Sequence, residues 1–117
     1  GCGLRSLTCD HADYHGIYCG SLPKRDAAYH QGTAWDFLLG GFLSAYAKVH
    51  DHSPECTKEL LFLLEPVRHH LTDNGCIGSI SEIFDGDAPH NPRGCYAQAW
   101  SVGETLRAYM QDVLPFI

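Results

Sequence analysis

The carboxylate of Glu82 is the first candidate for chemistry, because apolar residues surround it in the sequence. The segment reads Ile80-Ser81-Glu82-Ile83-Phe84. If it is extended, Ile80, Glu82 and Phe84 point to the same side. Burying an ionised carboxylate without a partner costs free energy, so such a glutamate is expected to be either paired or used. The alternative, in which Glu82 faces water in a twisted loop, stays open at this point.

Two more carboxylates, Asp85 and Asp87, follow on either side of Gly86. Taken alone, they are typical of a turn. A calcium loop needs more acidic positions in register than this segment offers. Arg93 comes shortly afterwards.

Aromatic, imidazole and amide side chains gather ahead of the first predicted long helix. They are Tyr29, His30, Gln31 and Trp35. Sugar sites are built in this way, because an aromatic ring stacks on the apolar face of a pyranose and polar side chains bind its hydroxyls. In the alternative interpretation, Tyr29 and Trp35 are core anchors and His30 is a loop histidine. A second group of this kind lies at the entrance of the last predicted helix and contains His90, Arg93, Gln98 and Trp100.

The apolar pattern predicts three helices that must position these side chains. The first begins near Thr33, with Thr33 and Asp36 placed as in a capping box, and it uses Trp35, Leu38, Leu39, Phe42, Tyr46 and Val49 as its apolar side. Ser53-Pro54 begins the second helix and Asn74-Gly75 ends it. This helix is apolar on more than one face, so it needs cover on both sides, and Pro66 is expected to bend it.

The third predicted helix runs from about Ala97 to Asp112, and Pro115 prevents its continuation. Its expected apolar side is made by Ala99, Val102, Gly103, Leu106, Tyr109, Met110 and Val113. Residues 1–32 are rich in Gly, Asp, His and Pro and are expected to be a loop-rich lead-in, with residues 33–117 helical. The polar connection over residues 75–95 is longer than a compact domain usually spends on a loop without function.

Length and charge exclude several classes of partner. The chain has 117 residues, enough for one domain, and a formal net charge of −6 from 8 basic and 14 acidic residues. The basic residues are scattered, so neither nucleic acid nor an anionic membrane surface is an expected partner. No segment approaches the about 20 apolar residues of a membrane span, and the N-terminus does not look like a signal sequence. We therefore expect a cytoplasmic protein.

The six cysteines favour reduced thiols over a disulfide scaffold, because the chain has long apolar segments from which to build a core. The sequence contains no C-x-x-C pair. Cys2, Cys9, His11 and His15 come close together, but their spacing matches no common zinc finger. A small metal-binding protein that uses this cluster is a weak alternative.

Three segments of the chain resemble the C-terminal region of glycogen debranching enzymes, the amylo-α-1,6-glucosidase family. They match in the right order, with similar intervening helices, and cover most of the chain. The segments are Tyr29-His30-Gln31-Gly32-Thr33 with Trp35, then Gly78-Ser79-Ile80-Ser81-Glu82-Ile83-Phe84-Asp85-Gly86-Asp87, and then Pro92-Arg93-Gly94-Cys95 with Ala97-Gln98-Ala99-Trp100-Ser101-Val102. The first segment also resembles a signature of related glucosidases and trehalases.

The resemblance implies an all-α fold, a partial α/α toroid of helical hairpins that forms the last part of a six-hairpin barrel. Residues 1–117 would then be a single segment, the C-terminal part of a glucosidase catalytic domain. Glu82 resembles the family's catalytic base, which activates water to hydrolyse an α-1,6-glucosidic branch. Inverting hydrolysis needs a second carboxyl group about 6.5–9.5 Å away as general acid, and no metal or organic cofactor. No residue here matches the acid's motif, so the acid is expected from outside this chain.

The resemblance also implies a glucose-binding wall and an α-glucan as substrate, such as glycogen or a limit dextrin. The candidates for this wall are Tyr29, His30, Gln31, Trp35, Asp85, Asp87, His90, Arg93 and Gln98. Asp85 and Asp87, close to Arg93, would either orient sugar hydroxyls or hold the arginine in place, and the sequence does not separate these two roles. Further partners would be the missing N-terminal part of the barrel or a second copy of the chain. The alternative hypothesis is a catalytically inactive carbohydrate-binding or assembly module, because the high apolar content and the two-sided second helix predict exposed apolar surface.

Overall fold

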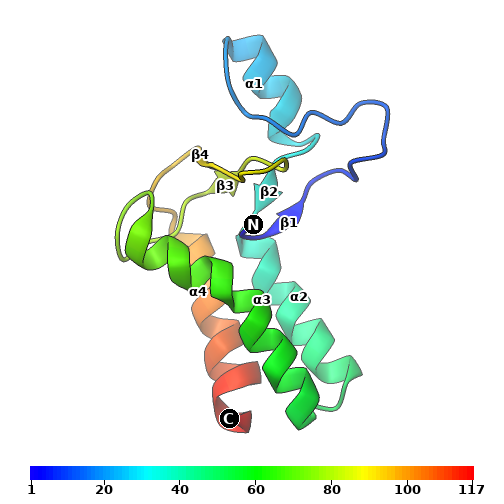
Figure 1. Cartoon of the computed structure of the whole chain (residues 1–117), viewed down its shortest axis with the longest axis vertical. Coiled ribbons are helices and arrows are strands. Elements are labelled where there is room, and N and C mark those ends of the chain that lie inside the picture. The colour runs from blue at the N-terminus through cyan, green and yellow to red at the C-terminus, as the bar shows by residue number, and fades with distance from the viewer.

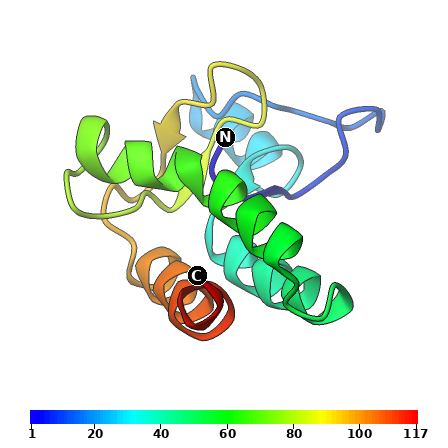
Figure 2. The ribbon, with the colours of Figure 1, turned by 60° about the horizontal axis from the view of Figure 1, so that its bottom comes forward.

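The computed structural model describes all 117 residues as a body of 45 × 32 × 21 Å. Three helices form one half of the molecule: α2 (Phe37–Val49), α3 (Pro54–Asp73) and α4 (Ala99–Ala108). A small sheet lies at their common end, and the short helix α1 (Leu22–Tyr29) lies beyond the sheet (Figure 1). Seen from the end of the bundle, α2 lies beside both α3 and α4 (Figure 2). No helix is long and apolar enough to span a membrane.

The sheet corrects the predicted fold class. Four strands pair antiparallel in chain order: β1 (Leu4–Arg5), β2 (Ala34–Trp35), β3 (Ile83–Phe84) and β4 (Pro92–Arg93). The prediction of an all-α fold, a partial α/α toroid of helical hairpins, is therefore wrong. Strands of two residues are too short to show an alternating pattern, so nothing local in the sequence marks them.

The start of α2 was also predicted wrongly, because residues 34 and 35 belong to a strand. Thr33 and Asp36 do not form a capping box. The hydroxyl of Thr33 donates to the carbonyl of Tyr29 at 2.7 Å, and the buried carboxylate of Asp36 accepts a hydrogen bond from the Thr105 hydroxyl at 2.9 Å. Asp36 therefore ties the start of α2 to α4.

The second helix agrees well with its prediction at both ends. Pro54 begins α3, and the Ser53 hydroxyl accepts a hydrogen bond from the backbone N–H of Cys56 at 3.2 Å. The helix ends at Asp73, and Gly75 follows with a positive φ of 62°. α3 continues through Pro66. These signals are local in the sequence, which is why they could be interpreted without the fold.

The buried faces of α2 and α4 differ from those predicted. α2 buries Leu39, Gly40, Leu43 and Ala47, whereas the expected core residues Leu38, Phe42 and Val49 are exposed. α4 buries Ser101, Thr105 and Ala108 against α2, while Leu106 of α4 and Met110 of the π-helical turn η1 (Tyr109–Val113) that follows it are exposed. The close α2–α4 contact selects small side chains, so the larger apolar residues of α4, such as Leu106, lie away from α2. The core joins all three helices to the sheet through Cys2, Ala34, Leu39, Leu43, Ala47, Cys56, Leu60, Val67, Ile80, Phe84, Ala108 and Val113.

Residues 1–32 are mostly irregular, with α1 as their one helix. Helix α1 begins at Leu22, has Pro23 in its first turn and ends at Tyr29. The glycine and proline content of the lead-in gave no sign of this helix. Because of α1, Tyr29 projects from the end of a helix and not from a loop.

Candidate functional site

Glu82 lies immediately before β3, half-buried, with both carboxylate oxygens engaged. Oε1 accepts a hydrogen bond from the hydroxyl of Tyr29, and Oε2 accepts one from the backbone N–H of Cys95 at 2.9 Å. The backbone N–H of Glu82 donates to the carbonyl of Cys95 at 2.8 Å. The structure thus selects the interpretation in which this carboxylate has partners. Two donors orient it while part of its surface stays open to solvent.

Tyr29 is a contact of Glu82, which the sequence alone did not indicate. Burial, and then the hydrogen bond to Glu82 and the negative charge of that carboxylate, raise the pKa of Tyr29 to about 12. The phenol therefore keeps its proton at neutral pH and remains a donor to the carboxylate. A neutral donor fixes the orientation of Glu82 without neutralising its charge.

Asp85 and Arg93 form an ion pair across the β3–β4 hairpin, in which the aspartate is buried and the arginine half-buried. The Asp85 carboxylate is fully buried and accepts hydrogen bonds from Nε of Arg93 at 3.0 Å and from Nη2 at 2.8 Å. It also accepts one from the backbone N–H of Tyr18 at 2.8 Å. The carboxylate raises the pKa of Arg93. Of the two roles left open by the sequence, these contacts are those of a carboxylate that holds the arginine in place.

Asp87 binds a different residue of the lead-in. Its Oδ1 accepts a hydrogen bond from the hydroxyl of Tyr14 at 2.9 Å, and the backbone N–H of Gly86 donates to the carbonyl of Gly16 at 2.7 Å. Nε of Arg5 donates to the carbonyl of Gly86 at 2.9 Å. Together with the Asp85–Tyr18 contact, these bonds fasten residues 5–18 to the segment that follows β3.

His90 lies apart from Glu82. Its Nδ1 is 3.0 Å from the carbonyl oxygen of Asp85, and its backbone has a positive φ of 62°. It lines a pocket of about 300 Å³ together with His69 and His70, and neither Glu82 nor Tyr29 contributes to this lining. The structure therefore does not bring His90 into the group around Glu82.

Trp35 and His30 extend the group around Tyr29. Trp35 is 5% exposed, and its Nε1 donates to the carbonyl of Tyr29 at 3.1 Å. The ring of Trp35 lies 4.8 Å from that of Tyr29, edge to face, and the exposed His30 stacks on Trp35 at 5.3 Å. Trp35 is thus a buried anchor, as the alternative interpretation held, whereas Tyr29 reaches the carboxylate.

The two predicted glutamines occupy different places. The backbone carbonyl of Gln31 accepts from the N–H of His15 at 2.7 Å, and its side chain is half-buried. Gln98 precedes α4, and its backbone N–H donates to the carbonyl of Ile80 at 2.8 Å. This bond places the first turn of α4 next to the residues that precede Glu82.

Three further aromatic residues lie near this group: Tyr18 and Phe37, which the sequence did not single out, and Trp100, which it grouped with Gln98 but did not place in the glucose-binding wall. Between ring centroids, Tyr18 lies 5.8 Å from Tyr29, and Trp35 lies 6.0 Å from Phe37 and 6.2 Å from Trp100. Trp100 is close to Gln98 in the sequence, but it is far from Trp35, so the contact between the two tryptophans could not be predicted from the sequence. We call the six rings, Tyr18, Tyr29, His30, Trp35, Phe37 and Trp100, the aromatic cluster.

The structure brings no three His, Cys, Asp or Glu side chains together in a group that could hold a metal ion. Cys2, Cys9, His11 and His15 therefore do not form the zinc cluster of the weak alternative. All six cysteines are free thiols, and burial raises the pKa of Cys2 to about 12.

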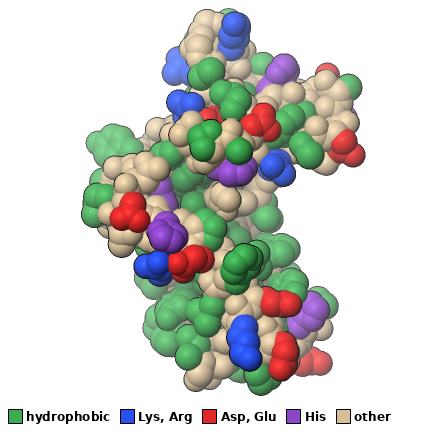
Figure 3. Space-filling model, in the orientation of Figure 1, with side chains coloured by type: hydrophobic (Ala, Val, Ile, Leu, Met, Phe, Trp, Pro, Cys, Tyr) green, Lys and Arg blue, Asp and Glu red, His purple; other side chains and the backbone are tan.

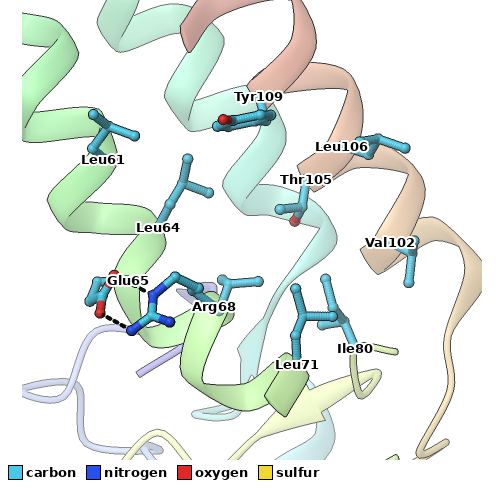
Figure 4. Close-up of a pocket in the computed structure, with 11 residues that line it drawn as sticks. Leu61, Leu64, Glu65, Arg68, Leu71, Ile80, Val102, Thr105, Leu106 and Tyr109 are labelled. Carbon is cyan, nitrogen blue, oxygen red and sulfur yellow. Dashed lines mark hydrogen bonds and ion pairs between the residues drawn. The ribbon is translucent and has the colours of Figure 1, made fainter. Parts of the chain in front are cut away.

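A second concave feature is an apolar groove between α3 and α4, with a volume of about 460 Å³ (Figure 4). In the space-filling view, hydrophobic side chains, coloured green, gather on the half of the molecule that α2, α3 and α4 form (Figure 3). The ion pair between Glu65 and Arg68 lies at its edge, with 2.7 Å between Oε1 and Nη2. The lining of the groove shares no residue with the aromatic cluster. It consists of Leu61, Leu64, Glu65, Val67, Arg68, Leu71, Ile80, Val102, Thr105, Leu106 and Tyr109.

Comparison with known proteins gives one result for the sequence and one for the structure. The model of the family described as amylo-alpha-1,6-glucosidase matches residues 1–107. The match includes every member of the group around Glu82 and ends before the last ten residues. No solved structure matches the chain.

Proposed function

Because the chain belongs to the amylo-alpha-1,6-glucosidase family, we propose that it carries the catalytic base of a glycoside hydrolase that cleaves α-1,6-glucosidic branch points of glycogen or related α-glucans. Residues 1–117 would be the C-terminal part of the catalytic domain. The observation that supports this role is the setting of Glu82, which is held by the hydroxyl of Tyr29 and the N–H of Cys95 while it stays partly accessible.

In the proposed reaction, Glu82 removes a proton from water, and the water oxygen attacks the anomeric carbon of the branch glucose. The bond from that carbon to the glycosidic oxygen breaks, and a general acid from outside this chain protonates the leaving oxygen. The proton gained by Glu82 later returns to solvent. The configuration at the anomeric carbon inverts, so the first product is β-glucose.

The other acidic residues near Glu82 already have partners, which supports an acid from elsewhere. Asp85 is buried against Arg93, and Asp87 binds the hydroxyl of Tyr14. These two carboxylates, with Arg93, would shape the glucose-binding wall by holding its loops rather than by donating a proton. Tyr29 would act through Glu82, and Gln31, Gln98 and His30 remain candidates for contact with sugar hydroxyls.

Glucose release from a branched dextrin trimmed by phosphorylase tests the proposal. The purified chain, combined with the N-terminal part of the barrel that supplies the general acid, is compared with Glu82→Gln in the same combination, a variant that keeps the size of the side chain and removes the base. We expect β-glucose as the first product by NMR and loss of release in Glu82→Gln, with unchanged circular dichroism. Release that is equal in both proteins would exclude Glu82 as the base. No release from either protein would favour the second candidate function.

That second candidate is an assembly module, and the apolar groove favours it. Leu61 and Leu106 in this groove are 39% and 56% exposed, although they belong to the two helices that line it. An added helix, from a second copy or another chain, would cover them. Sedimentation of the chain against Leu106→Glu tests this role: a concentration-dependent mass that disappears in Leu106→Glu supports it, and a constant monomer mass opposes self-association.

The six free thiols fit a reducing compartment, so we place the activity in the cytoplasm as part of this proposal.

A further inference from the structure

Trp100 combines exposure with a fixed orientation. It lies in the first turn of α4 and is 46% exposed. The ring of Phe37 stacks beneath it, with centroids 4.6 Å apart and planes 22° apart. Since Phe37 covers one face of the indole, the opposite face is the one that meets solvent. A tryptophan packed in this way presents a flat apolar surface without losing further conformational freedom when a ligand binds.

The aromatic cluster connects this surface to the candidate base. Trp100 meets Trp35 edge to face at 6.2 Å, and Trp35 meets Tyr29 at 4.8 Å. The hydroxyl of Tyr29 donates to Glu82. The N–H of Gln98, two residues before Trp100, donates to Ile80, two residues before Glu82. Two independent connections, one through rings and one through the backbone, therefore link Trp100 to Glu82.

The two tryptophans have different polar environments. The indole N–H of Trp35 donates to the carbonyl of Tyr29, which accounts for its one donor. Trp100 makes no side-chain hydrogen bond within the chain and does not line the apolar groove between α3 and α4. Its N–H is thus available to a ligand hydroxyl, and its exposed face lies outside the surface assigned to assembly.

We propose that the exposed face of Trp100 is a binding platform for a second glucose unit of the glucan, the one joined to the glucose whose bond is cleaved at Glu82. The inference rests on the proposed function and adds a specificity-determining residue to it. A pyranose offers a face of C–H groups that stacks on an indole, and hydroxyls at its edge that accept from an indole N–H. The platform would select an oligosaccharide over free glucose.

Indole NMR signals test the platform without relying on activity. The chain has two tryptophans, so the ¹⁵N-labelled protein gives two indole signals, and Trp100→Phe assigns them. The ligands are panose, a trisaccharide with one α-1,6 bond, and glucose. We expect panose to shift the Trp100 signal in a saturable way and glucose to leave it in place.

Variants at the same position give the matched control. Trp100→Phe keeps a stacking ring but lacks the indole N–H, so it should bind panose less tightly than the unchanged chain and more tightly than Trp100→Ala, which should weaken binding about tenfold or more. Because Trp100 is half-exposed, Trp100→Ala should still fold, and its thermal unfolding checks this. Equal panose affinity in the folded Trp100→Ala variant and the unchanged chain would overturn the proposal, as would a panose titration that leaves the Trp100 signal unmoved.

The Glu82→Gln variant separates this inference from the proposed function. If Glu82→Gln hydrolyses dextrin normally while panose still shifts the Trp100 signal, the base assignment fails and the platform stands. If Glu82→Gln is inactive and Trp100→Ala has the same KM for dextrin as the unchanged chain, the platform fails and the base assignment stands.

Discussion

A Cβ atom on Gly94 would lie 2.5 Å from Oε2 of Glu82, closer than non-bonded atoms approach. Gly94 has a φ of 66°, and the next residue, Cys95, donates its N–H to the same carboxylate oxygen. The absence of a side chain at position 94 thus allows Glu82 to reach its donor. Gly94 is part of the geometry of the site and not only of the turn.

We predict that Gly94→Ala displaces the Glu82 carboxylate and lowers the rate of glucose release by about 10²-fold, the effect expected of a small misplacement of a catalytic group. The positive φ should also cost about 1 kcal/mol of unfolding free energy. Gly78→Ala is the matched control, because Gly78 has a φ of 80° and nothing within 4 Å of an added Cβ. It should lose similar stability and keep its activity. Equal rates in the two variants would contradict the assigned role of Gly94.

The raised pKa of Tyr29 gives a second prediction that does not require turnover. Burial is the largest cause of the value of about 12, followed by the hydrogen bond to Glu82 and its charge. Glu82→Gln removes the charge and leaves the burial, so the pKa of Tyr29 should fall but stay above 10, the ordinary value. An alkaline titration of the tyrosine ¹³Cζ signals, assigned with Tyr29→Phe, measures it. A pKa unaffected by Glu82→Gln would show that the two side chains do not interact.

Local signals in the sequence predicted α3 well, and contacts between distant segments account for most of what it missed. The Ser53 cap and Pro54 lie next to the helix that they begin. In contrast, Leu4 of β1 pairs with Trp35, and Ala34 of β2 pairs with Phe84. Two-residue strands with partners so far along the chain leave no periodic trace. An all-α fold was expected because the helical periodicity was the only strong signal.

The candidate site shows the same division. The apolar neighbours of Glu82 and the family resemblance singled it out, but its bond to Tyr29 spans 53 positions of the chain. The sequence also could not show that α4 buries Ser101 and Thr105 against α2, since polar side chains are the less expected choice for a helix interface. Val102 and Leu106, assigned to the core by pattern, line the groove.

The buried carboxylate of Asp36 predicts a stability that depends on pH. Burial raises its pKa from 3.8 to about 6, and the hydrogen bond from Thr105 opposes part of that rise. Below pH 3.8 Asp36 is protonated in both the folded and the unfolded chain. As the pH rises from 3.8 toward 6, Asp36 ionises in the unfolded chain before it ionises in the folded chain, and this stabilises the unfolded state. The free energy of unfolding therefore falls by about 3 kcal/mol and levels off above pH 6.

Urea unfolding at several pH values, compared between the unchanged chain and Asp36→Asn, isolates this contribution. Asparagine still accepts from Thr105 through its carbonyl oxygen but does not titrate. The difference in unfolding free energy between the two proteins should therefore change over this pH range and be constant above it. A difference that does not depend on pH would mean that Asp36 ionises in the folded chain as it does in water.

Neighbouring glycines in α2 give a prediction for the packing that supports the site. A Cβ on Gly40 would lie 2.6 Å from the backbone carbonyl oxygen of Glu104 in α4, whereas an added Cβ on Gly41 meets nothing within 4 Å. Gly40→Ala should push α2 and α4 apart and lower the unfolding free energy by about 1–3 kcal/mol. Gly41→Ala should raise it by about 0.5–1 kcal/mol, because alanine favours a helix more than glycine does.

Thermal and urea unfolding of the two variants measure these opposite signs. Since Phe37 and Trp100 lie at the same end of α2 and α4 and stack on each other, separation of the helices should also loosen this pair. The Trp100 indole signal should then move in Gly40→Ala and stay in place in Gly41→Ala. Stabilisation by both substitutions would mean that α2 and α4 are not in close contact at Gly40, and the rigid support assigned to the Trp100 platform would fail with it.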